Sequence, residues 1–421
     1  MKRTGSADLP LHGGTVPPWL AERMKSLAGE ITEALVLAFG PDEVLVRLSD
    51  PMWFQCFGAV LGMDWHSSGI TTSVLYALKR AVNAHSREWG LAVCGGRGRF
   101  SRRTPEELAA YGGENGLDAA GLVRASRLCA KVDSAAVQDG FALYQHVFVV
   151  GRNGKWTVVQ QGMNPAGKTA RRYHWCSEGL RSFVEEPHAG VVGENRGPIL
   201  NLTAQEAGKT RDICVALARE KPEKVVKEVA AVSRGRGGGS QLLLFGGEEL
   251  VPAKASLPAT PRDLALPAHH DVKAEDVDLK RLGAVLATAY GAGTRDFESL
   301  LLTPGLGERT LQALALVGEV VYGTPGRFRD PARFSFAHGG KDGAPFPVPT
   351  KVYDESIRVL GTAIEESKLG YREKSDCIRR LHETAKAMEA RCNPEADFDA
   401  LLAHEWRNTR RWGGRTASGP A

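Results

Sequence analysis

Apolar residues near the start of the chain recur with the spacing of an amphipathic helix. Leu20, Met24, Leu27 and Ile31 follow one another at intervals of four, three and four residues, which places them on one face of a helix. A Pro-Pro pair precedes this pattern and a glycine follows it, as is typical of the first and last turns of helices. The sequence therefore predicts a helix over residues 16–40.

Further along, the pattern changes to short apolar runs that are typical of strands. Residues 91–94 form one such run, and residues 141–150 and 156–161 form two β-rich runs. The Gly-Arg-Asn-Gly segment at 151–154 separates the last two and is a turn signal. We therefore expect a β-hairpin within an α+β fold, in which a mixed α/β core domain at residues 1–232 carries the catalytic site.

Composition divides the rest of the chain. Residues 233–274 are rich in Gly, Pro and Ala, which predicts a linker or extended arm. Helical spacing returns after it, so we expect a helical domain at 275–412 and a flexible tail at 413–421. Within this domain the pattern predicts a helix over residues 277–290, and Asp296 is placed to cap the next helix.

A Pro-Gly-Leu-Gly turn between two of these helical patterns resembles the helix-hairpin-helix element of DNA-repair proteins. Glycine tolerates positive φ angles, so Gly305 and Gly307 let the backbone approach a ligand closely. A helix that begins at about Glu308 and continues with Arg309 would present unpaired N–H groups to a phosphate. The resemblance implies DNA binding through phosphates, although that family usually has a small residue at the position of Leu311. The alternative is an ordinary pair of helices joined by a Gly-Pro turn.

Arginine is concentrated in three segments, each of which also carries an aromatic residue. These segments are the Gly-rich run with Arg97, Arg99, Arg102 and Arg103, the Arg-Arg-Tyr-His-Trp run that starts with Arg171 and Arg172, and the Trp- and Arg-rich residues 406–415. Guanidinium groups bind phosphates and aromatic rings stack on bases, so this composition suits nucleic acid. We expect nucleic-acid contacts from Arg97, Arg99, Arg171, Arg172, Gly305, Gly307, Glu308 and Arg309. A half-buried aromatic patch and a solvated basic tail are the alternatives for the last two segments.

Overall composition excludes only a few classes of protein. The chain has 54 basic and 49 acidic residues, a net charge of +5 that is compatible with nucleic acid but not diagnostic. Its seven cysteines include no C-x-x-C pair, which argues against a zinc ribbon or a disulfide framework and for a reducing compartment. No segment reaches the ~20 apolar residues of a membrane helix. We therefore expect a cytoplasmic protein without a membrane partner.

Aspartate and histidine residues beside Gly-rich or strand-like segments are the candidates for chemistry. Asp64 and His66 lie two positions apart, so in an extended segment they face the same side. Asp133, Asp139 and His146 lie before or within the first hairpin strand. Carboxylates and imidazoles that converge suit Mg²⁺ or Mn²⁺ in phosphodiester hydrolysis. We expect Asp64, His66, Asp139 and His146 to be catalytic, the first three of them as metal ligands.

The alternative for each of these residues is a structural role as a cap, a turn former or a satisfied polar group. The chain has no P-loop, since no Gly-Lys-Ser/Thr follows its Gly-rich segments at the required spacing. No nucleotide cofactor is therefore expected.

Several unusual words occur along the chain in a fixed order. They include Asp-Leu-Pro-Leu-His-Gly-Gly at 8–14, Asp-Trp-His-Ser-Ser-Gly at 64–69, His-His at 269–270 and the Gly-rich segment 336–343. On these words the chain resembles, over about residues 2–388, a prokaryotic family found often in thermophiles, domain of unknown function seven-six-three. The resemblance implies no particular activity.

Together these features predict a DNA-binding protein of DNA processing or repair, with metal-dependent nuclease or phosphodiesterase activity. Two other hypotheses remain open, namely nucleic-acid binding without catalysis and an enzyme that acts on a small phosphorylated or nucleotide substrate. Duplex or branched DNA is the expected partner, and the apolar helix faces are also compatible with a homodimer.

Overall fold

The computed structural model describes most of the first 333 residues of the chain. The described ranges are residues 9–10, 18–63, 68–166, 169–233 and 278–333, together with the single residues 358, 362, 365 and 379. The predicted linker from residue 234 onward, the predicted tail, His269 and His270 therefore lie outside the described residues, as do Asp64 and His66.

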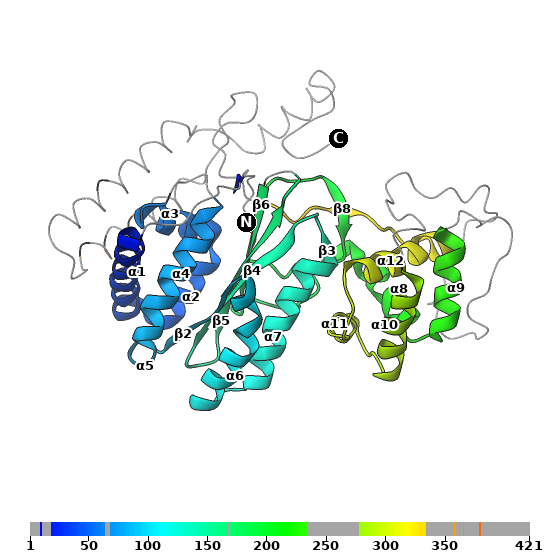
Figure 1. Cartoon of the computed structure of the whole chain (residues 1–421), viewed down its shortest axis with the longest axis horizontal. Coiled ribbons are helices and arrows are strands. Elements are labelled where there is room, and N and C mark those ends of the chain that lie inside the picture. The colour runs from blue at the N-terminus through cyan, green and yellow to red at the C-terminus, as the bar shows by residue number, and fades with distance from the viewer. Residues whose placement is uncertain are drawn as a thin grey trace, which may run out of the picture.

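An antiparallel sheet forms the centre of the molecule (Figure 1). Its strands lie in the order β1-β6-β5-β4-β2, and β7 pairs with β6. The strands are β1 (Leu9–Pro10), β2 (Leu91–Arg97), β4 (Ala142–Gly151), β5 (Trp156–Asn164), β6 (Thr169–Cys176) and β7 (Gly190–Val192). Strands β4 and β5 are the predicted hairpin, and Gly154 in their turn has the positive φ of 82° that favours glycine. The predicted hairpin is therefore confirmed.

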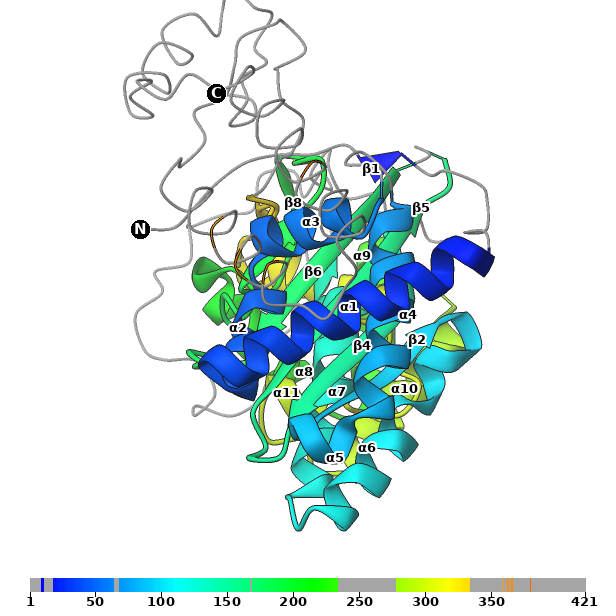
Figure 2. The same ribbon diagram turned by 90° about the vertical axis from the view of Figure 1, so that its left-hand side faces the viewer.

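The first face of the sheet is covered by the N-terminal helices, which cross it in Figure 2. They are α1 (Pro18–Phe39), α2 (Pro41–Ser49), α3 (Pro51–Val60), α4 (Gly69–Ala84) and the short α5 (Ser86–Trp89). Helix α1 confirms the predicted first helix, and Met24, Leu27 and Ile31 on its apolar face are buried. They share one hydrophobic core with Val147, Val149 and Val159 of the sheet. Burial of this stripe against the strands explains why α1 lies on the sheet.

The second face is covered by α6 (Thr104–Glu114) and α7 (Ala119–Lys131), which follow a 3₁₀ segment, η1 (Gly98–Arg103). Helix α7 continues into a π-helical turn, η2 (Val132–Ala136). A small second antiparallel sheet follows, in the order β3-β8-β9. Its strands are β3 (Val137–Gln138), β8 (Pro198–Asn201) and β9 (Phe328–Arg329).

A group of helices on the right of Figure 1 completes the described structure. It contains a 3₁₀ turn, η3 (Gln205–Ala207), and the helices α8 (Gly208–Ala218), α9 (Pro222–Ser233), α10 (Leu279–Gly291), α11 (Phe297–Leu301) and α12 (Glu308–Tyr322). Helix α10 confirms the prediction for residues 277–290, and Asp296 caps α11 by accepting from the backbone of Ser299 at 2.7 Å. Helix α12 packs on α8 and α9, and α10 packs on α9. Helices from both sides of residues 234–277 therefore pack together, while the domain boundaries remain predictions.

The α+β fold class is confirmed by this mixture of helices and antiparallel sheets. Within the described part of the chain, no helix combines the length and the apolar character that crossing a membrane requires.

Candidate functional site

A buried carboxylate, Asp133, lies at the centre of a polar network on the second face of the sheet. It belongs to the π-helical turn η2, a type of turn that often marks functional positions. Its oxygens accept hydrogen bonds from Gln160 Nε2 at 2.5 Å, Trp175 Nε1 at 2.9 Å and His188 Nε2 at 2.5 Å. Strands β5 and β6 supply the first two donors, and His188 precedes β7. Three donors hold the fully buried carboxylate in one orientation.

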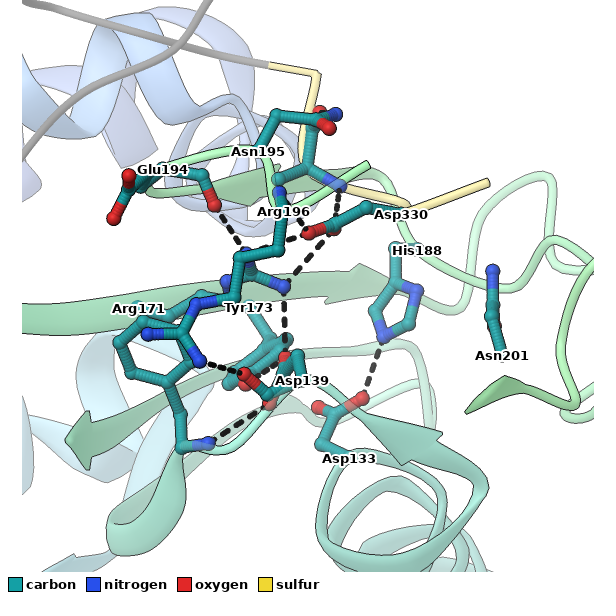
Figure 3. Close-up of polar contacts among 12 residues, drawn as sticks. Asp133, Asp139, Arg171, Tyr173, His188, Glu194, Asn195, Arg196, Asn201 and Asp330 are labelled. Carbon is teal, nitrogen blue, oxygen red and sulfur yellow. Dashed lines mark hydrogen bonds and ion pairs between the residues drawn. The ribbon is translucent and has the colours of Figure 1, made fainter. Parts of the chain in front are cut away.

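His188 connects this interior network to a cavity. An ionised Asp133 only accepts hydrogen bonds, so in a neutral His188 ring this contact puts the proton on Nε2 and leaves the lone pair on Nδ1. Figure 3 shows the ring between Asp133 and Asn201. The cavity has a volume of about 430 Å³. Its lining includes Ser49, Asp50, Glu186, His188, Thr203 and Arg333. The Asp133–His188 pair therefore has the geometry of an oriented base at the border of a ligand-sized space.

Glu186 forms part of the same cavity wall in an unfavourable backbone conformation. Its φ of 45° is the one positive value among the described residues other than glycine. Its carboxylate forms an ion pair with Arg333 at 2.7 Å, and its N–H donates to Thr203 O at 2.8 Å. Backbone strain of this kind is concentrated at functional sites.

The predicted catalytic residue His146 lies deep in the same network. Gln160 donates to Asp133 through Nε2, so its Oε1 accepts from His146 Nδ1 at 2.6 Å. His146 Nε2 then accepts from the Ser126 hydroxyl at 2.8 Å. Burial lowers the pKa of His146, which is consistent with a neutral ring. Both ring nitrogens are occupied, so in this conformation His146 supports the orientation of Gln160 and Asp133.

The predicted metal ligand Asp139 takes part in a second buried network (Figure 3). It accepts from Arg171 Nη1 at 2.9 Å and from the Tyr173 hydroxyl at 2.6 Å. Arg171 also contacts both carboxylate oxygens of Asp330, at 3.0 and 2.8 Å. Burial raises the pKa of Asp139, and Arg171 and Tyr173 offset only part of that shift. Arg171 of β6 thus joins Asp139 to Asp330, which lies in the segment after β9.

The predicted nucleic-acid contacts Arg171 and Arg172 are both fully buried. As neighbours on β6 they point to opposite faces of the sheet, and both faces are covered. Arg172 Nε donates to His174 Nε2 at 2.8 Å, and Nη2 donates to Gln55 Oε1 at 2.8 Å. His174 Nδ1 lies 3.0 Å from Leu48 O. Neither guanidinium is accessible to a nucleic acid in this conformation, and the sequence-based expectation for this pair is corrected accordingly.

The predicted contacts Arg97 and Arg99 are exposed where β2 passes into η1. Arg97 lies over the ring of Tyr144 and Arg99 over the ring of Phe100, at 5.8 and 5.1 Å from the centroids. At the base of this segment, Gly95 N–H donates to Glu107 at 2.8 Å. This backbone N–H is thus engaged by a carboxylate of the protein itself and does not point to a bound phosphate.

The predicted hairpin turn is anchored at its base and exposed at its tip. Gly305 has a φ of 80° and is exposed, as are Glu308 and Arg309, whereas Leu306 is buried. Lys131 Nζ donates to Leu306 O, and Gln138 donates to Glu308 O at 3.0 Å. Helix α11 packs on α8 and α7, while α12 packs on α8, α9 and η2.

The predicted metal site is only partly covered by the structure. Asp64 and His66 lie outside the described residues. Within the described ranges, no group of three or more His, Cys, Asp or Glu side chains is arranged to hold a metal ion.

Sequence reasoning overlooked His188, Asp330, Glu186 and Arg333. His188 and Glu186 lie in irregular backbone between β6 and β7, where no periodic pattern marks them. The sequence did contain a signal for buried polar networks in strand β6. Arg171 and Tyr173 lie on one side of this strand and Arg172 and His174 on the other, so both of its buried faces carry polar groups. Buried polar residues of this kind require partners, but the sequence does not show which ones.

Among the comparisons with known proteins, only the one with family models gave a match. No curated protein matches the chain, and no solved structure does. A family model described as "Protein of unknown function (DUF763)" matches residues 5–348, which is more than half of the chain. The resemblance predicted from the sequence is thereby confirmed, and the chain belongs to the DUF763 family.

Proposed function

We propose that the protein binds DNA through its phosphates in DNA processing or repair. The observation that carries this proposal is the arginine loop, defined as Arg97, Arg99, Arg102 and Arg103. All four side chains are exposed, and within the described residues none forms an ion pair with a carboxylate. Four exposed guanidinium groups within seven residues create a local positive potential that attracts a polyanion.

The surroundings of the arginine loop suit nucleic acid rather than a small anion. Phe100 is 45% exposed beside Arg99, and Tyr144 lies under Arg97. Lys79 Nζ donates to Gly95 O at 2.8 Å and pairs with Glu107 at 2.7 Å, which fixes the base of the loop. A rigid base with an aromatic ring among arginines provides phosphate contacts and a stacking surface together.

The hairpin turn is the second proposed contact, in the manner of a helix-hairpin-helix element. Gly307 is the N-cap of α12 and supplies no side-chain hydrogen bond to the first turn. The N–H groups of that turn therefore have no capping side chain, and the positive end of the helix dipole favours a phosphate there. The contacts from Lys131 and Gln138 hold the turn in place without covering its tip.

Metal-dependent cleavage is a further part of the proposal. It depends on Asp64 and His66, since the polar atoms of Asp139 and His146 are engaged with Arg171, Tyr173, Gln160 and Ser126. A bound Mg²⁺ or Mn²⁺ would supply a polarised phosphoryl group or an activated water.

The test is a binding titration with end-labelled single-stranded, duplex and forked DNA across a salt series in chelator. Replacing the four loop arginines with glutamine should weaken duplex binding and reduce the slope of log K against log salt by roughly 3 to 4, since each phosphate contact contributes about 0.9. The matched control replaces four exposed arginines elsewhere, Arg23, Arg87, Arg152 and Arg181. Equal losses in the two variants would show that only net charge matters and would remove the loop from the proposal.

The hairpin is tested separately with Gly305→Ala and Gly307→Ala. We expect weaker binding of similar size on unrelated sequences, because phosphate contacts position DNA without reading it. A Cβ at Gly305 would lie 3.3 Å from Val285 and strain a positive φ, so a thermal unfolding curve accompanies each variant. Unchanged affinity for DNA in folded variants would show that the hairpin turn does not contact DNA.

Cleavage is followed in the same samples after addition of Mg²⁺ or Mn²⁺. Product formation that disappears in Asp64→Asn or His66→Gln would support a nuclease. DNA binding without cleavage products, both with Mg²⁺ and with Mn²⁺, would indicate a non-catalytic DNA-binding protein.

A further inference from the structure

The cavity bordered by His188 is not used by the proposed DNA contacts. None of the arginine-loop or hairpin residues is among its lining residues. Its walls come from the α2–α3 junction, the segment before β7, the segment after β8 and the segment after β9. A volume of about 430 Å³ lies within the usual range of small-molecule sites and is too small for duplex DNA.

The histidine on this wall is arranged for proton transfer. With Asp133 ionised and the His188 ring neutral, Asp133 accepts from Nε2 and Nδ1 is the nitrogen with the free electron pair. When Nδ1 takes a proton from a hydroxyl group, the O–H bond breaks, its electron pair stays on oxygen, and the new N–H bond forms on the ring. The resulting imidazolium is stabilised by the carboxylate 2.5 Å from Nε2. Trp175 and Gln160 keep Asp133 in position for this task.

A cation on the same wall provides an anion contact. One terminal nitrogen of Arg333 pairs with Glu186, and within the described residues the other side-chain nitrogens have no hydrogen-bond partner. The guanidinium fork thus retains donors suited to a planar or tetrahedral oxyanion. The carboxylates of Asp50 and Glu186 also border the cavity and disfavour a ligand that is anionic throughout. The lining therefore matches a molecule with one oxyanion and several hydroxyl groups.

We propose that this cavity is an acid–base site for a small hydroxylated oxyanion, with Arg333 holding the oxyanion and His188 Nδ1 accepting a proton from a hydroxyl group. Asp133 is the positioning residue that sets the tautomer of His188. The strained backbone at Glu186 keeps the partner carboxylate of Arg333 at the wall. The oxyanion is a phosphate or a carboxylate, and the choice of probes separates the two.

The experiment uses the full-length chain and three probes: ribose 5-phosphate, glycerate and inorganic phosphate. Calorimetric titration should show binding of at least one hydroxylated probe, weakened about tenfold or more in Arg333→Gln, the loss expected for a charge-assisted contact. The matched control is Arg329→Gln, an exposed arginine four residues away that does not line the cavity. Equal affinity in both variants, or no binding of any probe, would overturn the proposal. Binding of ribose 5-phosphate alone would identify the phosphate form, and binding of glycerate alone the carboxylate form.

Nitrogen-15 spectra of labelled histidine test the base directly. His188→Gln identifies the His188 signals, which should report a proton on Nε2 and shift when a probe binds. Asp133→Asn should replace the single tautomer by a mixture while the fold, followed by thermal unfolding, is retained. A proton on Nδ1 in the wild type, or His188 signals unmoved by a saturating probe, would overturn the role of His188. If Asp133→Asn does not fold, the wild-type tautomer and the Arg333→Gln titration still decide the proposal.

Discussion

Arg171 and Arg172 are neighbours on β6, are both fully buried, and are nevertheless satisfied in different ways. Arg171 lies on the second face of the sheet, where Asp139 before β4 and Asp330 after β9 pair with it. Arg172 faces α3 and α4, where its contacts are the ring of His174, the amide oxygen of Gln55 and the hydroxyl of Thr71. One guanidinium is neutralised by carboxylates and the other is only solvated by neutral groups.

The two environments have opposite effects on the guanidinium groups. Burial disfavours the charge of Arg171, but Asp139 and Asp330 outweigh it and hold the pKa above the ordinary value. Burial without a carboxylate lowers the pKa of Arg172 to about 9. The ring of Phe54, 4.6 Å from the Arg172 guanidinium, adds a cation–π contact. On the first face of the sheet, no carboxylate offsets the desolvation of the Arg172 charge. On the second face, the charge of Arg171 is paired and joins segments that are distant in the sequence.

The largest expected effect follows from removing the paired cation. Arg171→Met would leave Asp139 and Asp330 buried without their partner, and we expect a loss of about 3–5 kcal/mol in the free energy of unfolding. Denaturant titration of Arg171→Met, Asp330→Asn and the double variant measures the loss and the coupling. Additive losses would contradict the account, because the two residues would then act independently.

Arg172→Met is the matched test on the other face. It removes a buried charge that lacks a carboxylate, so the relief of desolvation offsets part of the lost hydrogen bonds. We expect a loss of about 1–3 kcal/mol, the usual cost of leaving buried acceptors without donors. If this variant loses as much stability as Arg171→Met in the same titration, pairing with carboxylates does not distinguish the two faces.

Much of the fold on both faces could be predicted from local patterns. The stripe of Met24, Leu27 and Ile31 specified helix α1, and the capping position of Asp296 specified the start of α11. Both signals act between residues at most one or two helical turns apart, which is why the sequence alone contains them.

The polar networks could not be predicted in the same way, because they join residues far apart along the chain. Asp330 lies 159 residues from Arg171, and Asp133 lies 55 residues from His188. Asp133, Asp139 and His146 were recognised as candidates, but their partners depend on the register of β4, β5 and β6. The sequence therefore identified residues whose side chains could take part in acid–base or metal chemistry. It left open which of them the fold would bring together.

Acidification provides a smaller test of the first face. Burial holds the pKa of His174 well below its ordinary value, and the charge of Arg172 contributes in the same direction. The folded state thus keeps a neutral ring, while the unfolded chain binds a proton below about pH 6.5. Stability is lost as the pH falls, by about 1.4 kcal/mol per unit, so we expect His174 to contribute a loss of that size at pH 5.5 relative to pH 8. Burial also lowers the pKa of His146, which adds to the loss in the same direction. Denaturant midpoints at both pH values should differ less in His174→Gln, and an identical difference in the two proteins would argue against a neutral His174.

The smallest effect is expected for an ion pair at the surface. Arg124 of α7 contacts Glu298 of α11 at 2.6 Å, but the two side chains are 46% and 23% exposed. Water competes for both charges and salt screens them, so Arg124→Met should lose only about 0.2–1 kcal/mol, and less at high ionic strength. Like Arg171, Arg124 bridges segments distant in sequence, so the two methionine variants differ mainly in the burial of the pair that is broken. A loss near 3 kcal/mol for Arg124→Met, unchanged by salt in the same denaturant titration, would show that the tie between segments, rather than burial, sets the size of the effect at Arg171.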